Sequence, residues 1–310
     1  MPEAEYAWLP KEDILDFEET TRLARVFAMA GATRLRLTGG EPLLRRDLPV
    51  LVAQLAEAVR WDDLALTTNG ILLAPVADRL KAAGLQRITV SLDTLDPARF
   101  KALTRSDELP RVREGLEHAA RVFPGFKIDT VVMRGVNEGE IESLVPEAAR
   151  LGAEIRFIEY MDVGGATRWT ADQVFSRADT LASLTRSVGA PVPLREEQWA
   201  PAARFRLPDG QVIGIISSTT EPFCATCDRS RLTADGMWYR CLYATSGTDL
   251  RAQVRGGATD DQLRQLIVET WTARADQGAE DRLRVTDRHA FVPITSLKRD
   301  THLEMHPRGG

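Results

Sequence analysis

The chain has 310 residues, of which 44% are hydrophobic and 27% charged, and it carries a formal net charge of −5. This length predicts about two domains, and the acidic balance argues against a nucleic-acid-binding surface. No apolar run approaches the roughly 20 residues of a membrane span, and the N-terminus lacks a signal-peptide pattern. The three clustered cysteines do not form a secreted disulfide framework, so they favour a cytoplasmic protein.

Between residues 16 and 162, short apolar strands alternate with amphipathic helices. The patterns predict strands at 34–37, 64–67, 87–91, 127–133 and 154–159, and helices at about 17–30, 48–59, 72–83, from 97 onward and 138–151. The expected N-caps of four helices are Asp16, Asp47, Asp96 and Asn137. This alternation indicates parallel strands in an α/β barrel or an open doubly wound sheet.

Polar segments directly follow four of these strands. They are Thr38-Gly39-Gly40-Glu41, Thr67-Thr68-Asn69, Ser91-Leu92-Asp93 and Tyr160-Met161. Parallel α/β folds bind their ligands at the C-terminal ends of strands, so the four segments predict one shared site. Loops that only cap helices would explain any single segment, but they explain all four less well.

Three of the expected strands carry a cation on the face opposite to their helix-packing side chains: Arg36, Lys127 and Arg156. If the apolar faces pack under helices, these cations point into the lumen of a barrel. A buried cation needs either a counter-ion or an anionic ligand. The alternative to a bound anion is internal pairing with a carboxylate: Glu41, Asp129 or Glu154.

The pattern changes after about residue 185. Pro191-Val192-Pro193 indicates a linker, and residues 204–207 and 211–217 predict a hairpin around Pro208-Asp209-Gly210. A helix is expected at 259–275, and the polar residues after about 285 are typical of a mobile tail.

All three cysteines lie in one short stretch. Cys224 and Cys227 form a C-x-x-C pair, and thirteen residues separate Cys227 from Cys241. The residues between them predict a hairpin that returns Cys241 to the pair and places Arg229 and Arg231 on one face beside it. Three thiolates suit an iron–sulfur cluster with one open iron better than a structural zinc, which needs four protein ligands. Zinc and plain buried thiols remain the alternatives.

Taken together, five segments resemble the GTP 3′,8-cyclase family of molybdenum cofactor biosynthesis, in the radical S-adenosylmethionine (SAM) superfamily. They are Arg36-Leu37-Thr38-Gly39-Gly40-Glu41-Pro42, Thr67-Thr68-Asn69-Gly70, Val90-Ser91-Leu92-Asp93, Arg156-Phe157-Ile158-Glu159-Tyr160-Met161-Asp162, and the cysteine stretch with its two arginines. The Gly-Gly-Glu-Pro segment alone is typical of the whole superfamily. The cysteines and arginines near the C-terminus are typical of this cyclase.

The resemblance implies a partial (β/α)6 TIM-like barrel that lacks its first strand, over residues 1–185, and a smaller C-terminal α+β domain over 186–310. In that family two 4Fe–4S clusters face each other across the barrel. The N-terminal cluster cleaves SAM to a radical that abstracts a hydrogen from the ribose of GTP, and the sugar carbon then attacks the purine. The second cluster binds guanine through its open iron.

The resemblance also implies roles for individual residues. The expected ligands of the C-terminal cluster are Cys224, Cys227 and Cys241. The expected SAM contacts are Gly39, Gly40, Glu41, Ser91 and Met161. The expected GTP contacts are Arg36, Thr67, Lys127, Arg156, Arg229, Ser230 and Arg231. Further implied partners are an electron donor and the next enzyme of the molybdopterin pathway, with the chain as a monomer or homodimer.

The chain departs from the family at its beginning. It contains no C-x3-C-x2-C motif for an N-terminal cluster, and it starts Met1-Pro2-Glu3, which resembles the stretch that directly follows that motif. One explanation is that Met1 is not the natural start, and a second 4Fe–4S cluster is expected only with an extension. The other is a non-catalytic paralogue that binds GTP and one cluster. In both cases the printed chain is expected not to cleave SAM.

Overall fold

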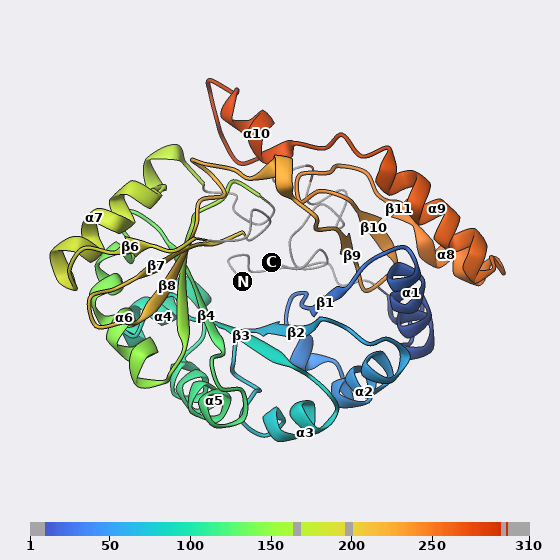
Figure 1. Cartoon of the computed structure of the whole chain (residues 1–310), viewed down its shortest axis with the longest axis horizontal. Coiled ribbons are helices and arrows are strands. Elements are labelled where there is room, and N and C mark those ends of the chain that lie inside the picture. Colours follow the sequence, from blue (N-terminus) through green and yellow to red (C-terminus); the bar gives the residue numbers. More distant parts are fainter. Residues whose placement is uncertain (1–9, 164–168, 196–200, 293–295, 297–310) are drawn as a thin grey trace.

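The computed structural model describes residues 10–163, 169–195, 201–292 and 296. Within them, eight strands form one sheet in the order β1-β2-β3-β4-β5-β8-β7-β6, which curves into an open barrel with helices along its outer side (Figure 1). The strands are β1 (Arg34–Leu37), β2 (Asp63–Thr68), β3 (Arg87–Ser91), β4 (Lys127–Val132), β5 (Glu154–Glu159), β6 (Val192–Pro193), β7 (Ala203–Arg206) and β8 (Val212–Ile216). Neighbours from β1 to β5 and β8 are parallel, whereas β7 and β6 are antiparallel. The predicted α/β partial barrel is confirmed.

The outer helices pack on the apolar face of this sheet. They are α1 (Phe17–Met29), α2 (Leu48–Ala58), α3 (Ala77–Ala82), α4 (Pro97–Thr104), α5 (Leu109–Val122), α6 (Ile141–Arg150) and α7 (Arg177–Ser187). In β4 and β5 buried and half-buried residues alternate strictly, with the buried set under the helices and the other set facing the lumen. This alternation is what turns charged side chains inward at the site.

Two of the four expected N-caps are confirmed. Asp16 and Glu19 form a reciprocal capping box at α1, and Asp96 accepts a hydrogen bond from the Arg99 amide 2.6 Å away at α4. The expected cap at Asp47 is wrong, because its backbone adopts a left-handed conformation with φ of 58° and its side chain bonds no helix amide. The expected cap at Asn137 is also wrong, because its side chain is used in a loop.

Two expected boundaries also need correction. The helix expected at 72–83 is reduced to α3 (Ala77–Ala82), since Pro75 disfavours a helical residue before it and lacks an amide proton. The linker expected at Pro191-Val192-Pro193 instead forms β6, where Val192 pairs with Arg206 at the edge of the sheet. An edge strand tolerates proline because one side of its backbone has no strand to bond.

The hairpin predicted after the C-x-x-C pair is confirmed. β9 (Arg231–Leu232) pairs antiparallel with β10 (Met237–Tyr239), which pairs with β11 (Thr248–Asp249). Gly236 makes the turn with φ of 85°, and a Cβ there would lie 2.6 Å from the Cβ of Arg251. This small sheet therefore requires glycine at its tightest point.

A second hydrophobic core joins the C-terminal elements to α1. Helices α8 (Leu250–Arg255) and α9 (Asp260–Thr272) lie beside α1 in Figure 1, and the shared buried side chains are Leu15, Leu23, Val26, Trp238, Leu250, Leu263 and Ile267. At the rim, Arg22 pairs with Asp260 at 2.7 Å and Arg255 with Glu19 at 2.7 Å. These contacts hold the cysteine-bearing hairpin in front of the barrel.

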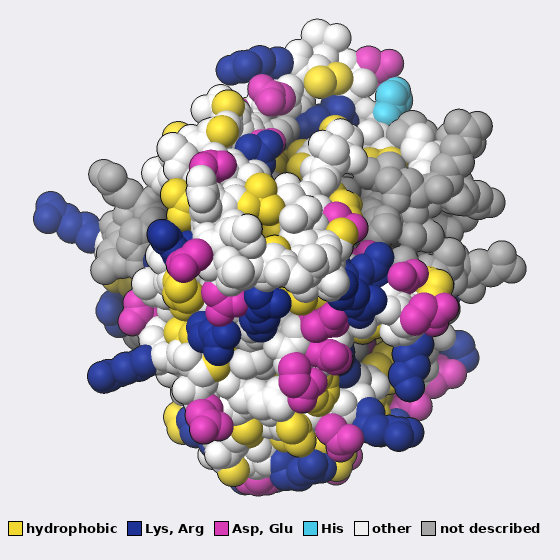
Figure 2. Space-filling model, turned by 90° about the vertical axis from the view of Figure 1, so that its right-hand side faces the viewer, with side chains coloured by type: hydrophobic (Ala, Val, Ile, Leu, Met, Phe, Trp, Pro, Cys, Tyr) yellow, Lys and Arg dark blue, Asp and Glu magenta, His cyan; other side chains and the backbone are white. Residues whose placement is uncertain are grey.

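On the side of the molecule to the right in Figure 1, basic and acidic side chains are interspersed and hydrophobic ones are scattered (Figure 2). Within the described residues, no helix combines the length and apolar character that a membrane span requires. The domain boundary expected at residue 185 stays a prediction, and the main sheet crosses it because β8 pairs with β5. Most of the expected C-terminal tail lies outside the described residues.

Candidate functional site

A cavity of about 2780 Å³ lies between the inner face of the barrel and the cysteine hairpin. It brings together nearly every residue that the sequence predicted: Arg36, Gly39, Gly40, Glu41, Thr67, Lys127, Arg156, Met161, Cys224, Cys227, Arg229, Ser230, Arg231 and Cys241. Ser91 does not line it; this residue is exposed at the end of β3. Residues as far apart in the sequence as Arg36 and Cys241 thus line one cavity.

Strand register arranges the inward-facing side chains in layers. Lys127 lies beside Glu154, and one layer further along the strands Asp129 lies beside Arg156. Arg156 in turn neighbours Gly214 of β8. A Cβ on Gly214 would come within 3.0 Å of the Arg156 side chain, so the missing side chain makes room for the guanidinium.

Glu154 is the main counter-ion of this layered region. Its carboxylate lies 2.8 Å from Arg156 Nε, 2.9 Å from Arg204 Nη2 and 3.6 Å from Lys127 Nζ. The expected alternative of internal pairing is therefore realised for Arg156 and Lys127. One carboxylate cannot neutralise three cations, however, so the cavity wall keeps a local positive excess in an acidic protein.

Two of the cations have a lowered pKa. Burial and the neighbouring Arg156 lower the pKa of Lys127 to about 8, although Glu154 opposes the shift. Desolvation by the surrounding protein and the charge of Arg87 lower the pKa of Arg36, although its side chain stays exposed within the open cavity. The Nη1 of Arg36 lies 3.4 Å from Thr67 Oγ1, and in the part of the chain that the structure describes no carboxylate lies within 4 Å of its guanidinium. Cations held this way would gain stability from a bound anion.

The Glu41 carboxylate is engaged inside the protein and does not pair with Arg36. It accepts hydrogen bonds from Thr68 Oγ1 and the Asn69 amide, both at 2.7 Å, and from the Leu43 amide at 3.0 Å. These bonds tie the loop after β1 to the loop after β2. Glu41 therefore holds the Gly39-Gly40 turn in place, where Gly39 has φ of 141°, a value that side chains strongly disfavour.

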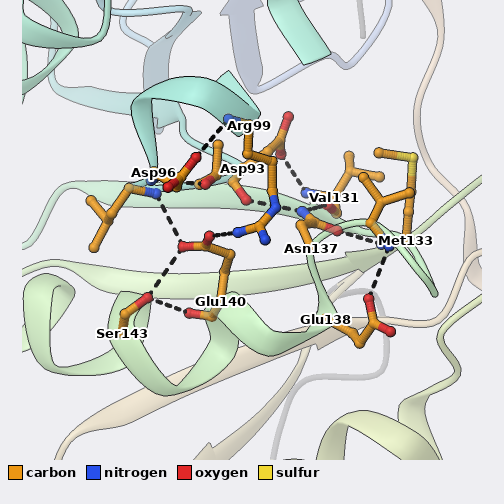
Figure 3. Close-up of polar contacts among 12 residues, drawn as sticks. Asp93, Asp96, Arg99, Val131, Met133, Asn137, Glu138, Glu140 and Ser143 are labelled. Atoms are coloured by element: carbon orange, nitrogen blue, oxygen red, sulfur yellow. Dashed lines mark hydrogen bonds and ion pairs between the residues drawn. The ribbon is translucent and has the colours of Figure 1, made fainter. Parts of the chain in front are cut away.

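A polar network fixes the loop that follows Ser91 (Figure 3). The amide nitrogen of Asn137 donates to the carbonyls of Asp93 and Val131, at 2.9 and 2.8 Å, and its oxygen accepts from the Met133 amide at 2.7 Å. Asp93 Oδ1 accepts from the Val131 amide at 2.8 Å. Burial, reinforced by the charge of Asp129, raises the pKa of Asp93 to about 6. The ends of β3 and β4 are thus held together beside the cavity.

The second half of this network is centred on Glu140, which is buried at the start of α6. Its carboxylate pairs with Arg99 and accepts hydrogen bonds from the Leu95 amide at 3.2 Å and the Ser143 hydroxyl at 3.2 Å. Figure 3 shows the side chain of Arg99, from α4, and those of Glu140 and Ser143, from the start of α6, converging on one another. Sequence reasoning did not single out this network, because its members are ordinary polar residues of four separate segments.

The cysteine hairpin presents three half-buried free thiols to the cavity. Burial raises the pKa of Cys224, whereas at Cys227 the charge and hydrogen bonds of Arg229 and Arg274 outweigh burial and lower the pKa. Arg229 Nη2 lies 3.6 Å from the Cys227 sulfur. The thiolate is the form of cysteine that binds a metal, and a lowered pKa favours it at Cys227. The three thiols are therefore chemically suited to hold a metal ion or a cluster.

The described residues contain no group of three or more His, Cys, Asp or Glu gathered tightly enough for a single metal ion. The choice between a zinc ion and an iron–sulfur cluster therefore stays a prediction. It depends on the count of three thiols, since a structural zinc needs four protein ligands and a cluster can keep one iron open.

Sequence reasoning missed several cations that line this cavity, and two of them contact predicted site residues or their counter-ion. Arg274, just beyond α9, donates from Nη1 to the Cys227 carbonyl at 2.6 Å, and its guanidinium lies 4.7 Å from the ring centre of Trp271. Arg204 of β7 shares Glu154 with the barrel cations. The alternation of charged and apolar residues at Arg204-Phe205-Arg206 could have indicated Arg204. No local pattern indicates Arg274, since it lies 47 positions from Cys227.

Comparison with known proteins divides the chain into two matched regions. Residues 4–146 match the Radical SAM superfamily, and residues 153–280 match Molybdenum Cofactor Synthesis C. The chain is 53% identical over 315 aligned residues to GTP 3′,8-cyclase 1 of Mycobacterium tuberculosis, covering 100% of this chain and 88% of that protein. The chain belongs to the GTP 3′,8-cyclase family of radical SAM enzymes. The predicted family is therefore confirmed.

A second relative of the family is GTP 3′,8-cyclase of Acidothermus cellulolyticus, 46% identical over 284 residues, with 89% of this chain and 78% of that protein covered. Among solved structures, TYW1 with a lysine-pyruvate adduct bound overlaps 58% of this chain and 63% of its own, at 16% identity and a TM-score of 0.44. That overlap is too limited to carry an argument. For this family, 4Fe–4S clusters and SAM are the cofactors and GTP is the substrate.

Proposed function

We propose that this chain binds GTP in the barrel cavity for conversion to (8S)-3′,8-cyclo-7,8-dihydroguanosine 5′-triphosphate in molybdenum cofactor synthesis. The observation that carries the proposal is the meeting of two elements in one cavity. The barrel contributes cations from β1, β4 and β5, and the C-terminal hairpin contributes three thiols with two arginines. The names of the close relatives support the same activity.

The triphosphate would bind to the positive wall of the cavity. Arg36, Lys127 and Arg156 approach it from the barrel, and Arg229 and Arg231 from the hairpin. Guanidinium groups can hold phosphate oxygens in bidentate pairs, and the hydroxyls of Thr67 and Ser230 add neutral donors. A bound anion would also restore the pKa values of Arg36 and Lys127 toward their ordinary range.

Cys224, Cys227 and Cys241 would hold one 4Fe–4S cluster. Such a cluster, bound by three thiolates, keeps one iron free for a nitrogen or oxygen donor of the substrate. The hairpin sets where that group would lie, because Arg274 fixes the Cys227 carbonyl and α9 is packed on α1. The base of GTP would then face the hairpin while its phosphates face the barrel cations.

SAM would bind at the strand ends where Gly39, Gly40 and Met161 line the cavity, with Ser91 at the adjoining edge. Glycine leaves the backbone open to close approach by a ligand. Glu41 would act by holding the turn, because its carboxylate is already occupied by three internal hydrogen bonds. An electron donor and the next enzyme of the molybdopterin pathway would be the partners, in the cytoplasm.

The three cysteines of this sequence would together serve a single cluster. We therefore expect the 310-residue chain to bind GTP without cleaving SAM. A non-catalytic GTP- and cluster-binding paralogue is the second candidate, and this shared ligand set is the observation that favours it. The two candidates differ in whether the protein purified from its own cells turns GTP over.

The test compares two preparations under anaerobic conditions, each with its clusters reconstituted. GTP binding, 5′-deoxyadenosine and cyclised nucleotide are measured for the 310-residue chain and also for the protein from its own cells. We expect binding in the first and turnover in the second. Binding without turnover in both identifies the paralogue, and no GTP binding in either contradicts both candidates.

A further inference from the structure

One carboxylate in the cavity is not used as a counter-ion. Asp129 lies in the middle of β4, on the lumen face with Lys127, and lines the cavity. Its Oδ1 is inaccessible to water and has no hydrogen-bond partner among the described residues. Burial raises its pKa, although the charges of Arg156, Arg36 and Lys127 oppose the shift. A carboxylate that has no internal donor is costly to bury, and a donor on a ligand in the cavity that Asp129 lines would reduce this cost.

The neighbouring Glu154 is a counter-ion in the same cavity, and its ion pairs can be compared with the surroundings of Asp129. Glu154 has three cations within 4 Å, whereas in the described part of the chain Asp129 has none at that distance. The two residues lie on adjacent strands and in adjacent layers, and both face the lumen. The ion pairs of the cavity floor therefore form without Asp129, and its carboxylate is left facing the site.

The charge of Asp129 limits what it can bind. A carboxylate repels phosphate oxygens, so its partner on a nucleotide must be a neutral donor such as a hydroxyl or an N–H group. The cations around Asp129 are those proposed for the triphosphate, and the sugar is the part of a nucleotide bonded directly to the phosphates. Acidic side chains hold ribose hydroxyls in this way in dinucleotide-binding folds.

We propose that Asp129 accepts a hydrogen bond from a ribose hydroxyl of the bound GTP, and thereby positions the sugar and selects ribonucleotides. This inference rests on the proposed function of the cavity. Asp129 would be a specificity-determining residue that touches the substrate, set between the cations that bind the phosphates and the hairpin that faces the base.

The test measures binding of GTP, 2′-deoxy-GTP and 3′-deoxy-GTP to the cluster-reconstituted chain by calorimetry. A hydrogen bond to a charged acceptor predicts that at least one deoxynucleotide binds about tenfold to a hundredfold more weakly than GTP. In Asp129→Ala this ratio should fall to within about threefold of unity. The ratio is the readout because loss of a negative charge changes the affinity for every triphosphate alike.

Two further variants make the result interpretable. Asp129→Asn keeps an acceptor oxygen and nearly the same shape, so it should fold normally and retain a reduced ratio of about twofold to tenfold. Glu154→Gln changes the charge of the same cavity and should alter the affinities for GTP and its deoxy forms equally. Thermal unfolding of each variant establishes that the proteins compared are folded.

The other outcomes are equally decisive. An unchanged ratio in Asp129→Ala overturns the inference while leaving the GTP site intact. Loss of SAM affinity with an unchanged GTP ratio would assign the carboxylate to the ribose of SAM, which also overturns it. Failure of the unsubstituted chain to bind GTP would contradict the proposed function itself.

Discussion

Arg288 and Asp162 form a buried, two-point ion pair, with Nε to Oδ2 at 2.8 Å and Nη2 to Oδ1 at 3.1 Å. Asp162 is fully inaccessible and also accepts hydrogen bonds from Arg282 Nε at 2.7 Å and Tyr243 Oη at 2.8 Å. It directly follows Met161, so this contact anchors the segment around α10 (Gly278–Leu283) to the end of β5. The ion pairs of Asp162 therefore connect the C-terminal region directly to Met161, a proposed SAM contact.

Replacement of Asp162 by Asn should strongly destabilise the fold. Two buried guanidinium groups would lose their counter-charge, which typically costs about 3–5 kcal/mol. The free energy of unfolding from denaturant titration measures the loss. Asp281→Asn is the matched control, because Asp281 pairs with Arg284 on an exposed surface and should cost less than about 1 kcal/mol. Equal effects of the two substitutions would contradict the anchoring role.

Replacement of Glu41 by Ala should loosen the Gly39-Gly40 turn. The Thr68 hydroxyl and two loop amides would lose their acceptor, at a cost of about 1–3 kcal/mol in unfolding free energy. SAM affinity, measured by equilibrium dialysis, should fall as well, since the turn would no longer be held. Glu114→Ala, at an exposed position of α5, should change neither quantity. Unchanged stability in Glu41→Ala would show that its three bonds do not hold the loop.

GTP affinity should depend on pH through Lys127. Its pKa is lowered to about 8, so the amine loses its positive charge as pH rises through that value. We expect affinity to fall about three- to tenfold between pH 7 and pH 9, since one charge-assisted contact is lost. Lys127→Arg stays charged throughout this range, and its affinity should fall less. Parallel pH profiles for the two proteins would exclude Lys127 from the phosphate site.

Stability should depend on pH through Asp93. Its folded pKa is raised from 3.8 to about 6, so the folded state binds the proton more tightly than the unfolded state. Stability from this group therefore falls as pH rises from about 4 to 6, and the penalty stays constant above that. Relative to Asp93→Asn, which does not titrate, the difference should be about 1–2 kcal/mol after allowance for solvent access. A constant difference across this window would contradict the raised pKa.

Arg274 should help the hairpin to retain its cluster. It donates to the Cys227 carbonyl and helps to lower the pKa of the Cys227 thiol, so Arg274→Met should loosen one proposed ligand. We expect lower iron content after reconstitution and faster loss of iron to a chelator, by several-fold. Arg264→Met, on the exposed face of α9, is the control and should resemble the unsubstituted chain. Equal iron loss in both variants would mean that Arg274 serves only packing.

Local features of the sequence predicted local structure well. The capping box at Asp16, the proline after Asp96 and the turn at Gly236 each depend on residues within about five positions, and all three are confirmed. Two predicted N-caps, Asp47 and Asn137, were wrong. For Asn137 the cause lies in the tertiary structure. Asn137 is a residue type that often caps helices. Its side-chain amide is instead hydrogen-bonded to backbone groups of Asp93, Val131 and Met133, so it is not available to a helix amide.

The sequence predicted which cations belong to the site and that they face the lumen, but it did not predict which carboxylates they pair with. Alternation in β4 and β5 was enough to turn Lys127 and Arg156 inward, because side chains of a strand alternate between its faces. It could not show that Glu154 would serve both of them together with Arg204, because that depends on β5 lying between β4 and β8. The same sheet order leaves Asp129 without a counter-ion within 4 Å among the described residues.

The sequence by itself determined the family, the order of the barrel strands, and a set of candidate site residues of which all but Ser91 line the cavity. These follow from motifs, periodicity and turn residues, which are properties of short segments. Only the tertiary structure decided which charges are paired, which carboxylate faces the ligand, and that Arg274 reaches Cys227. Those relationships depend on distances between segments far apart in the chain, and such distances are set only once the sheet has formed and α9 has packed on α1.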